Sequence, residues 1–163
     1  MSYSLLSFSN PKILKGRDVY SEYLSAILHL SPINTKICPY QDIAGCTEAC
    51  LTTAGRGGII KKGETTNTIQ LDRERKTKLF LEARDSFMDN LITDIQKFVR
   101  YCSKKDKLHC LRLNGTSDIQ WEHIKIDGKN IFEMFPDVQF YDYTKIPTRK
   151  IEQYKNYHLT GSY

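Results

Sequence analysis

The stretch that decides the fold reads CPYQDIAGCTEAC over residues 38–50 and continues as LTTAGRGG over residues 51–58. It contains Cys38, Cys46 and Cys50, three of the five cysteines in a chain of 163 residues. A helical turn at Cys46 would place it and Cys50, four residues later, on one face. Thiolates select zinc, copper(I) or iron–sulfur clusters over hard cations. The spacing therefore predicts that the three cysteines are ligands of one metal centre.

Three local sulfur ligands favour an iron–sulfur cluster with one open iron, because a closed structural zinc site normally takes four protein ligands. We expect a [4Fe–4S] cluster, with zinc as the alternative. Cys102 and Cys110 have no local ligand spacing, so each is either a small buried residue or a distant fourth ligand. Arg56 and Gly57 are candidate cofactor-binding residues, through a guanidinium and backbone amides. The other interpretation of Arg56 is a solvated loop arginine.

Composition indicates one domain over residues 1–163, with residues 1–18 as an irregular arm. No uncharged apolar run is long enough to span a membrane, and the first residues lack the features of a signal peptide. We therefore expect a protein of the cytoplasm, where thiols stay reduced. A net charge of +5 is modest, and we do not expect a nucleic-acid partner from it.

Hydrophobic periodicity predicts alternating strands and helices along the chain. A helical pattern begins near Thr68 and runs to about Tyr101, and residues 84–86 mark a break with Asp85 as a second N-cap, so that either two helices or one kinked helix is expected. The other expected elements are strands within residues 20–33, 109–114, 138–143 and 157–163, and helices over residues 131–135 and 149–154. This alternation predicts an α/β fold, either a partial parallel sheet or a partial (β/α) barrel, with flanking helices.

Polar residues follow the predicted strands, and ligands of parallel sheets bind beyond the carboxyl ends of the strands. Asn114 and Asp118 follow one strand, residues 142–145 follow another, and the cysteine segment follows the first. We expect these segments to meet, which makes Asn114 and Asp118 candidate cofactor-binding residues. The alternative is that either residue caps a following helix. The sequence assigns no catalytic residue.

The cysteine segment, with TAGRG at residues 53–57, resembles the gene product 88 family of bacteriophage proteins. The likeness continues through residues 73–80, 113–118, 141–145 and 156–160. It implies a viral iron–sulfur centre on Cys38, Cys46 and Cys50, an unknown redox partner in the host, and the cytoplasm of the infected cell. Family members run on past the position of Tyr163, so we expect a chain short for its family. Its last strand is then free to form a homo-oligomer.

A weaker similarity connects the chain with radical S-adenosylmethionine enzymes, in which three cysteines of one loop hold a four-iron cluster. The gaps here are seven and three residues, where theirs are usually three and two. Three functions follow from the sequence. The first is an iron–sulfur protein with an electron-transfer or redox role. The alternatives are a zinc-stabilised nucleic-acid-binding module and a radical S-adenosylmethionine-like enzyme.

Overall fold

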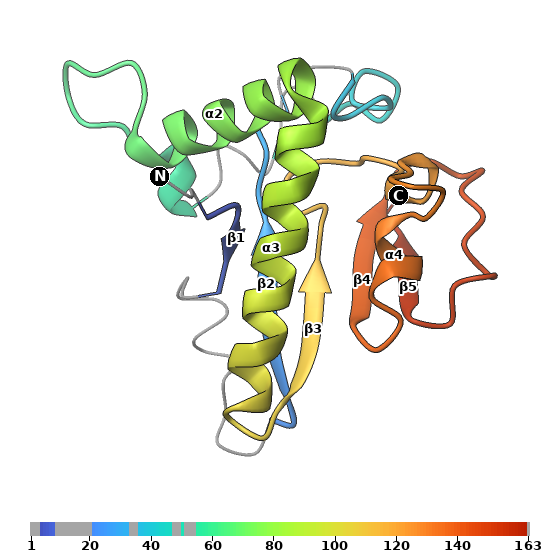
Figure 1. Ribbon diagram of the computed structural model, residues 1–163. Helices are drawn as coiled ribbons and strands as arrows, with labels where there is room; N and C mark the ends of the chain where they lie inside the picture. The colour runs from blue at the N-terminus through green and yellow to red at the C-terminus, as the bar shows by residue number, and fades with distance from the viewer. Residues whose placement is uncertain (1–3, 9–20, 33–35, 47–49, 51–54, 163) are drawn as a thin grey trace.

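The protein is described here by a computed structural model that covers residues 4–8, 21–32, 36–46, 50 and 55–162. A five-stranded sheet in the order β1-β2-β3-β4-β5 forms its centre, with helices packed against it (Figure 1). The strands are β1 Leu6–Ser7, β2 Tyr23–Leu28, β3 Leu108–Arg112, β4 Gln139–Thr144 and β5 Tyr157–Gly161. The helices are η2 Gly55–Gly58, α2 Thr68–Glu82, α3 Arg84–Ser103, η3 Trp121–His123 and α4 Ile131–Met134.

Strands β2 to β5 are mutually parallel, and β1 pairs antiparallel with β2. The register places Leu111 beside Ala26 and Phe140, and Phe140 beside Tyr157, and all four residues are buried. Helices α3 and α4 cover this apolar face, and Phe132 of α4 stacks on Tyr157 at 4.1 Å between ring centroids (Figure 1). The predicted α/β fold with a mostly parallel sheet is confirmed, and the sheet is open rather than closed into a barrel.

The predicted long helix is two helices that meet at Ala83, whose backbone angles (φ −139°, ψ 63°) are not helical. Arg84 holds this junction, because its Nε donates to the Phe80 carbonyl over 2.8 Å and its guanidinium lies over the Phe80 ring. The prediction of Asp85 as the N-cap is wrong. The N-cap of α3 is Ala83, which makes no side-chain hydrogen bond.

An aromatic cluster fixes the segment after β3 against the helix junction. The Phe80 and Phe87 rings meet edge to face at 5.1 Å, and Trp121 of η3 lies 5.6 Å from Phe80. All three side chains are essentially buried. Such edge-to-face pairs contribute about 0.5–1.5 kcal/mol each beyond the burial of their area. The loop that leaves the carboxyl end of β3 is therefore anchored in the core.

The first strand is pinned by a buried carboxylate of α3. Asp94 Oδ2 accepts hydrogen bonds from the backbone amides of Leu5 and Leu6, at 2.6 and 3.4 Å. Leu5 and Leu6 are buried beside it. The arm expected over residues 1–18 thus includes a short strand, and residues 1–3 and 9–20 lie outside the described part of the chain.

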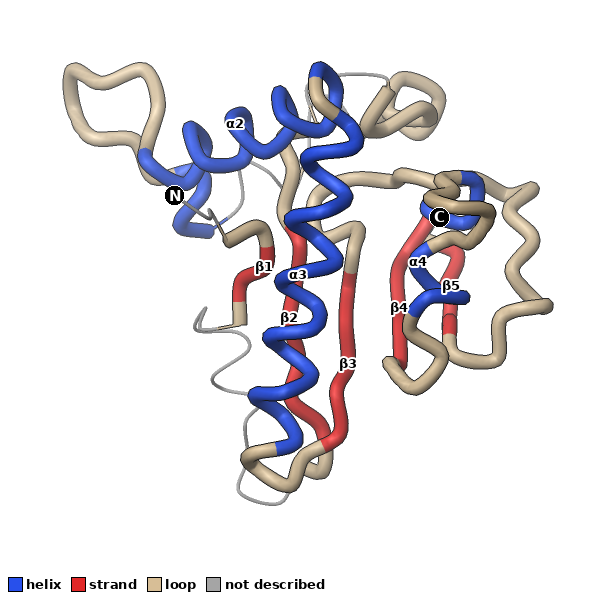
Figure 2. Tube along the Cα trace, viewed as in Figure 1, coloured by secondary structure: helices blue, strands red, loops and turns tan. Residues whose placement is uncertain are grey.

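The connection from β4 to β5 contains no helix (Figure 2). A helix over residues 149–154 was predicted from a short polar run, and that prediction is wrong. Arg149 is instead drawn into the interior, where it donates hydrogen bonds to Glu122 and Tyr157. Tyr154 accepts a hydrogen bond from Asn130 Nδ2 over 2.7 Å. These tertiary contacts override the weak local preference for a helical turn.

Candidate functional site

A cavity of about 680 Å³ lies at the carboxyl edge of the parallel strands. Its lining comes from the cysteine segment, from α2 and from the segments that follow β2, β3, β4 and β5. The lining residues used below are Cys38, Cys46, Cys50, Arg73, Arg112, Asn114, Gly115, Asp118, Tyr143, Thr144, Lys145 and Ser162. The structure therefore brings together residues that lie more than 100 positions apart in the chain.

All three clustered cysteines border this cavity, and each is half-buried and outside any disulfide. Consecutive turns wind the segment, with Gln41 N donating to Cys38 O over 3.2 Å and Cys46 N donating to Gln41 O over 2.9 Å. Gly45 has a positive φ of 62°, a conformation that glycine adopts without strain. The helical turn expected after Cys46 falls largely on residues 47–49 and 51–54, which lie outside the described residues.

The thiols share one electrostatic environment. Burial, with the Asp118 carboxylate as a smaller cause, raises the pKa of Cys38 to about 12, against an opposing hydrogen bond from the Asp118 backbone. Cys50 and Cys46 act on Cys38 in the same upward direction. Within the described residues, no group of three or more His, Cys, Asp or Glu side chains is gathered closely enough to hold a metal ion. The three cysteine thiols border one cavity, but in the described structure they are not close enough together to coordinate one metal ion.

Asn114 organises the loop that follows β3. Its Oδ1 accepts hydrogen bonds from Ser117 Oγ, the Ile119 amide and Trp121 Nε1, at 2.9 to 3.0 Å. Gly115 then passes so close to the end of β2 that a Cβ there would lie 2.6 Å from the Leu28 carbonyl oxygen. The Asn114 side chain thus shapes the cavity wall, and its role as a cofactor-binding residue stays a prediction.

Asp118 ties this loop to the end of β4. Its Oδ1 accepts from Thr144 Oγ1 at 2.7 Å and from Arg149 Nη1 at 3.3 Å, and its Oδ2 accepts from the Lys145 amide at 2.8 Å. Arg149 is itself fully buried and donates twice to Glu122, at 2.9 and 2.7 Å. This buried charge network connects the segments that form the floor of the cavity. The backbone amide of Asp118 also donates to the Ile37 carbonyl, next to Cys38.

Cationic side chains reach the cavity from three elements: Arg73 from α2, Arg112 from β3 and Lys145 after β4. Arg112 was not predicted from the sequence, although it is the last residue of a strand and lies two residues before Asn114. Its position within a predicted strand concealed it, since alternation there was interpreted as packing. The rule that parallel strands carry sites at their carboxyl ends could have found it.

Arg56 and Gly57 lie in η2, and neither is among the described residues that line the cavity. The Gly57 carbonyl accepts hydrogen bonds from Asn67 Nδ2 at 3.0 Å and Gln70 Nε2 at 2.7 Å, so its backbone anchors the start of α2. The Arg56 side chain lies outside the described part of the structure. No finding tests the prediction that these two residues bind a cofactor.

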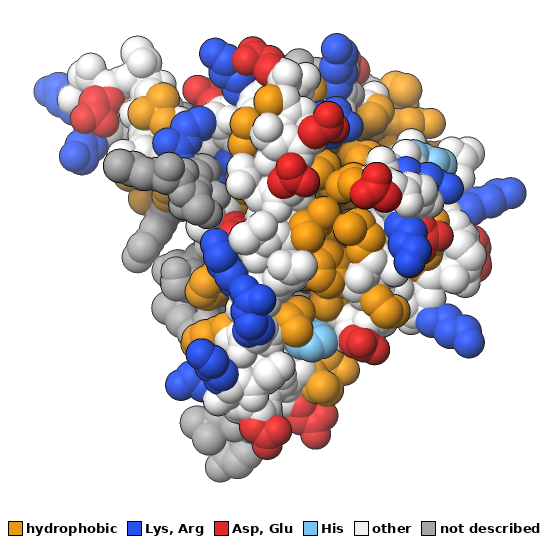
Figure 3. Space-filling view, in the orientation of Figure 1, with side chains coloured by type: hydrophobic (Ala, Val, Ile, Leu, Met, Phe, Trp, Pro, Cys, Tyr) orange, Lys and Arg blue, Asp and Glu red, His pale blue; other side chains and the backbone are white. Residues whose placement is uncertain are grey.

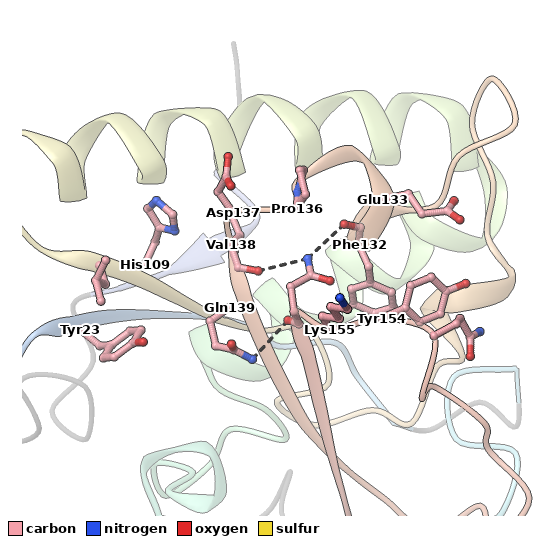
Figure 4. Close-up of a pocket in the computed structure, with 13 residues that line it drawn as sticks. Tyr23, His109, Phe132, Glu133, Pro136, Asp137, Val138, Gln139, Tyr154 and Lys155 are labelled. Atoms are coloured by element: carbon pink, nitrogen blue, oxygen red, sulfur yellow. Dashed lines mark hydrogen bonds between the residues drawn. The ribbon is translucent and has the colours of Figure 1, made fainter.

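A second cavity, of about 550 Å³, lies at the opposite edge of the sheet, where the strands begin (Figure 4). Its lining includes Tyr23, His109, Gln139 and Asn156, all at or near the amino ends of strands. Apolar side chains gather on the neighbouring face between α3 and α4 (Figure 3). Asn156 Nδ2 donates to the carbonyls of Phe132 and Val138, as the dashed lines in Figure 4 show.

The fold and the first cavity define the class: an α/β protein with an open, mostly parallel sheet and a cysteine-lined cavity at its carboxyl edge. A family model described as gene product 88 matches residues 4–163. The chain therefore belongs to the gene product 88 family, and the predicted bacteriophage assignment is supported.

A search of curated proteins and a search of solved structures found no match. The similarity to radical S-adenosylmethionine enzymes finds no support in these comparisons. Among the described helices, none is long and apolar enough to cross a membrane.

Proposed function

We propose that this chain is a viral iron–sulfur protein whose cluster, of the [4Fe–4S] type, is held by Cys38, Cys46 and Cys50. The observation that carries the proposal is that all three thiols border one cavity at the carboxyl edge of the sheet. Soft thiolate donors suit this cluster, and three of them leave one iron for an exogenous ligand. Formation of the centre would draw the three thiols together and release their protons.

The other cysteines support a three-ligand centre over closed zinc. Cys102 is buried within α3 and Cys110 lies on β3, and neither lines the cavity. Among its described lining residues there is no histidine and no fourth cysteine. A structural zinc site takes four protein ligands, so the available donors match a cluster better.

Positive charge beside the thiols supports the same proposal. Burial lowers the pKa of Arg73, and the nearby Cys50 opposes that shift, which places the guanidinium within electrostatic reach of this thiol. A cation at this distance offsets part of the negative charge of a thiolate-bound cluster and raises its reduction potential. The cluster would supply one-electron chemistry in exchange with a redox partner of the host cell. The open strand edge at β5 is where a second copy of the chain would pair.

The test is anaerobic purification followed by metal and sulfide analysis of three proteins. The wild type and the control Cys110→Ala should be brown and hold iron and sulfide in near-equal amounts. Cys46→Ala should lose both, because it removes one of three ligands. Colourless protein with one zinc per chain and salt-dependent retention on DNA would replace the proposal with the zinc module. Protein with neither metal would overturn it.

The same sample separates electron transfer from a radical S-adenosylmethionine enzyme. Addition of that compound should leave the magnetic resonance spectrum of the reduced cluster unchanged if the protein only carries electrons. A perturbed spectrum would place the compound on the open iron and favour the enzyme.

A further inference from the structure

The acidic and basic side chains at the carboxyl-edge cavity differ in how completely the protein pairs them through hydrogen bonds. The Asp118 carboxylate, which lines the cavity, accepts three hydrogen bonds from the protein. The Asp142 carboxylate is buried outside the lining and accepts a hydrogen bond from the Asn114 amide at 2.9 Å. The Lys145 ammonium has three N–H donors, and one of them donates to the Ser162 carbonyl at 2.7 Å. The Asp118 carboxylate is therefore matched by the fold itself, while a buried guanidinium donor of Arg112 is left over in the described part of the chain.

Arg112 has a buried side-chain donor that the protein, in its described residues, does not use in a hydrogen bond. Its Nε is buried and has no hydrogen-bond partner in the described structure, and its closest carboxylate oxygen, on Asp142, is 3.6 Å away. The guanidinium lies over the Tyr143 ring, 4.9 Å from the centroid, and the side chain is 21% exposed. A planar guanidinium fixed in this way presents its donors as a fork, which matches the two oxygens of a carboxylate or a phosphate.

His29, directly after β2, is affected by the same positive charges. Burial is the main cause that lowers the pKa of His29 to about 4, and the charges of Arg73, Lys76 and Arg112 contribute to the same shift. Cations from α2 and β3 therefore act on one imidazole beside the cavity. A positive potential in a partly enclosed space attracts anions.

We infer that the carboxyl-edge cavity binds a small organic anion, a carboxylate or phosphate compound, whose oxygens Arg112 holds as a fork with Lys145 and Arg73 beside it. A volume of about 680 Å³ is in the range of small-molecule sites. The inference deepens the proposed function and rests on it for the view that the bound anion is the substrate beside the cluster. Anion binding itself depends only on the protein's own cations.

The test is calorimetric titration of the full chain with inorganic phosphate and, separately, with succinate. At least one should bind to the wild type with a dissociation constant below about 1 mM, and the pattern identifies a phosphorylated or a carboxylate ligand. Arg112→Gln should weaken binding at least about tenfold. Arg112→Lys keeps the charge without the fork and should show intermediate affinity. The matched control Arg100→Gln removes one exposed arginine of α3, far from the lining, and should bind like the wild type.

Repeating the titration on metal-free Cys46→Ala separates the two proposals. Anion binding there, with loss at Arg112→Gln, supports the inference even if no cluster forms in the wild type. In this protein the Nε–H resonance of Arg112 should shift on addition of the bound anion. Absence of binding by both anions to the wild type, equal affinity in Arg112→Gln, or equal loss in Arg100→Gln would each overturn the inference.

Discussion

The two edges of the sheet carry cavities of similar size and use their polar side chains in opposite ways. At the amino edge, Asn156 Nδ2 donates to three backbone carbonyls at 3.0 to 3.3 Å, and Gln139 Nε2 donates to two more. At the carboxyl edge, Arg112 leaves its buried Nε without a hydrogen bond in the described structure. The amino-edge cavity is a gap between elements that its own side chains bind together.

This difference follows from how a parallel sheet is built. Loops that leave the carboxyl ends lie next to one another, so residues distant in sequence can meet there without disturbing the core. The loop after β3 is rigid because Trp121 and Asn114 are buried within it. An anchored wall with soft thiols and an Arg112 donor that no described residue satisfies is suited to binding, whereas a cavity whose amides are already paired is suited to stability. Four substitutions test this comparison.

The largest effect is expected from Arg149→Met, which breaks the floor of the carboxyl-edge cavity. Removal of the fully buried guanidinium leaves the carboxylates of Asp118 and Glu122 without their cation. We expect a loss of about 3–5 kcal/mol in the free energy of unfolding, measured with urea, together with reduced iron content. Lys150→Met, an exposed neighbour, is the control and should cost less than about 0.5 kcal/mol. A cost below about 1 kcal/mol for Arg149→Met would show that this network does not hold the edge.

Asn156→Ala should have the next largest effect, at the amino edge. It removes one amide that serves the carbonyls of Phe132, Phe135 and Val138, so we expect a loss of about 2 kcal/mol. Iron content and anion affinity should stay at wild-type values, because those functions lie at the other edge. Gln153→Ala, an exposed residue of the same cavity, is the control. Loss of iron or of anion binding in Asn156→Ala would contradict the division between the edges.

Asp142→Asn should change the pH dependence of stability. Burial raises the pKa of Asp142 to about 7, against the opposing hydrogen bond from Asn114 and the charges of Arg112 and Arg149. The folded state therefore binds more protons than the unfolded state between pH 4 and 7. Wild-type stability should fall as pH rises through that window, by about 1 kcal/mol per pH unit from this group, and level off above it.

In Asp142→Asn that contribution should vanish, and the difference between the two unfolding curves across pH 4–7 measures it. Asp137→Asn is the matched control, because Asp137 is exposed and lines the amino-edge cavity. Its pH profile should follow the wild type. Parallel profiles for wild type and Asp142→Asn would mean that Asp142 titrates as in the unfolded chain.

Much of the fold could be predicted from the sequence, because long periodic segments and strand-like runs are strong local signals. These signals located β2 to β5, α4 and the region of both long helices, and the order of elements predicted that the cysteine segment and residues 114–118 would meet. Strand β1 could not be predicted, since two residues carry no pattern and Asp94 of α3 holds them in place. The helix break was predicted at residues 84–86 and lies at Ala83, but its cap was not predicted, because the Phe80 and Arg84 contacts that hold it depend on the assembled junction.

The candidate site divides in the same way. Cys38, Cys46 and Cys50 were predicted from spacing, and Asn114 and Asp118 from their place after a strand, and all five line one cavity. Arg112 and the network around Arg149 were not predicted, because both depend on which strands are neighbours. Whether a charged side chain already has hydrogen-bond partners depends on which strands lie beside it in the assembled sheet. Local sequence therefore indicated the cavity but could not distinguish Arg112, with its donor unpaired among the described residues, from the structural charges around Arg149.

The smallest effect is expected from His109→Leu, at the amino edge. His109 Nδ1 is a buried nitrogen without a hydrogen-bond partner in the described structure, so this residue is the amino-edge counterpart of Arg112. If the amino edge is structural, replacing the imidazole with an apolar side chain removes an unsatisfied atom and should change stability by less than about 0.5 kcal/mol. Phosphate and succinate affinity should be unchanged, in contrast to Arg112→Gln. A tenfold loss of anion affinity in His109→Leu, measured by the same titration, would mean that the unsatisfied nitrogen marks a binding site at this edge too. The paired amides of Asn156 and Gln139 would then frame a site, and the two edges would differ in ligand rather than in role.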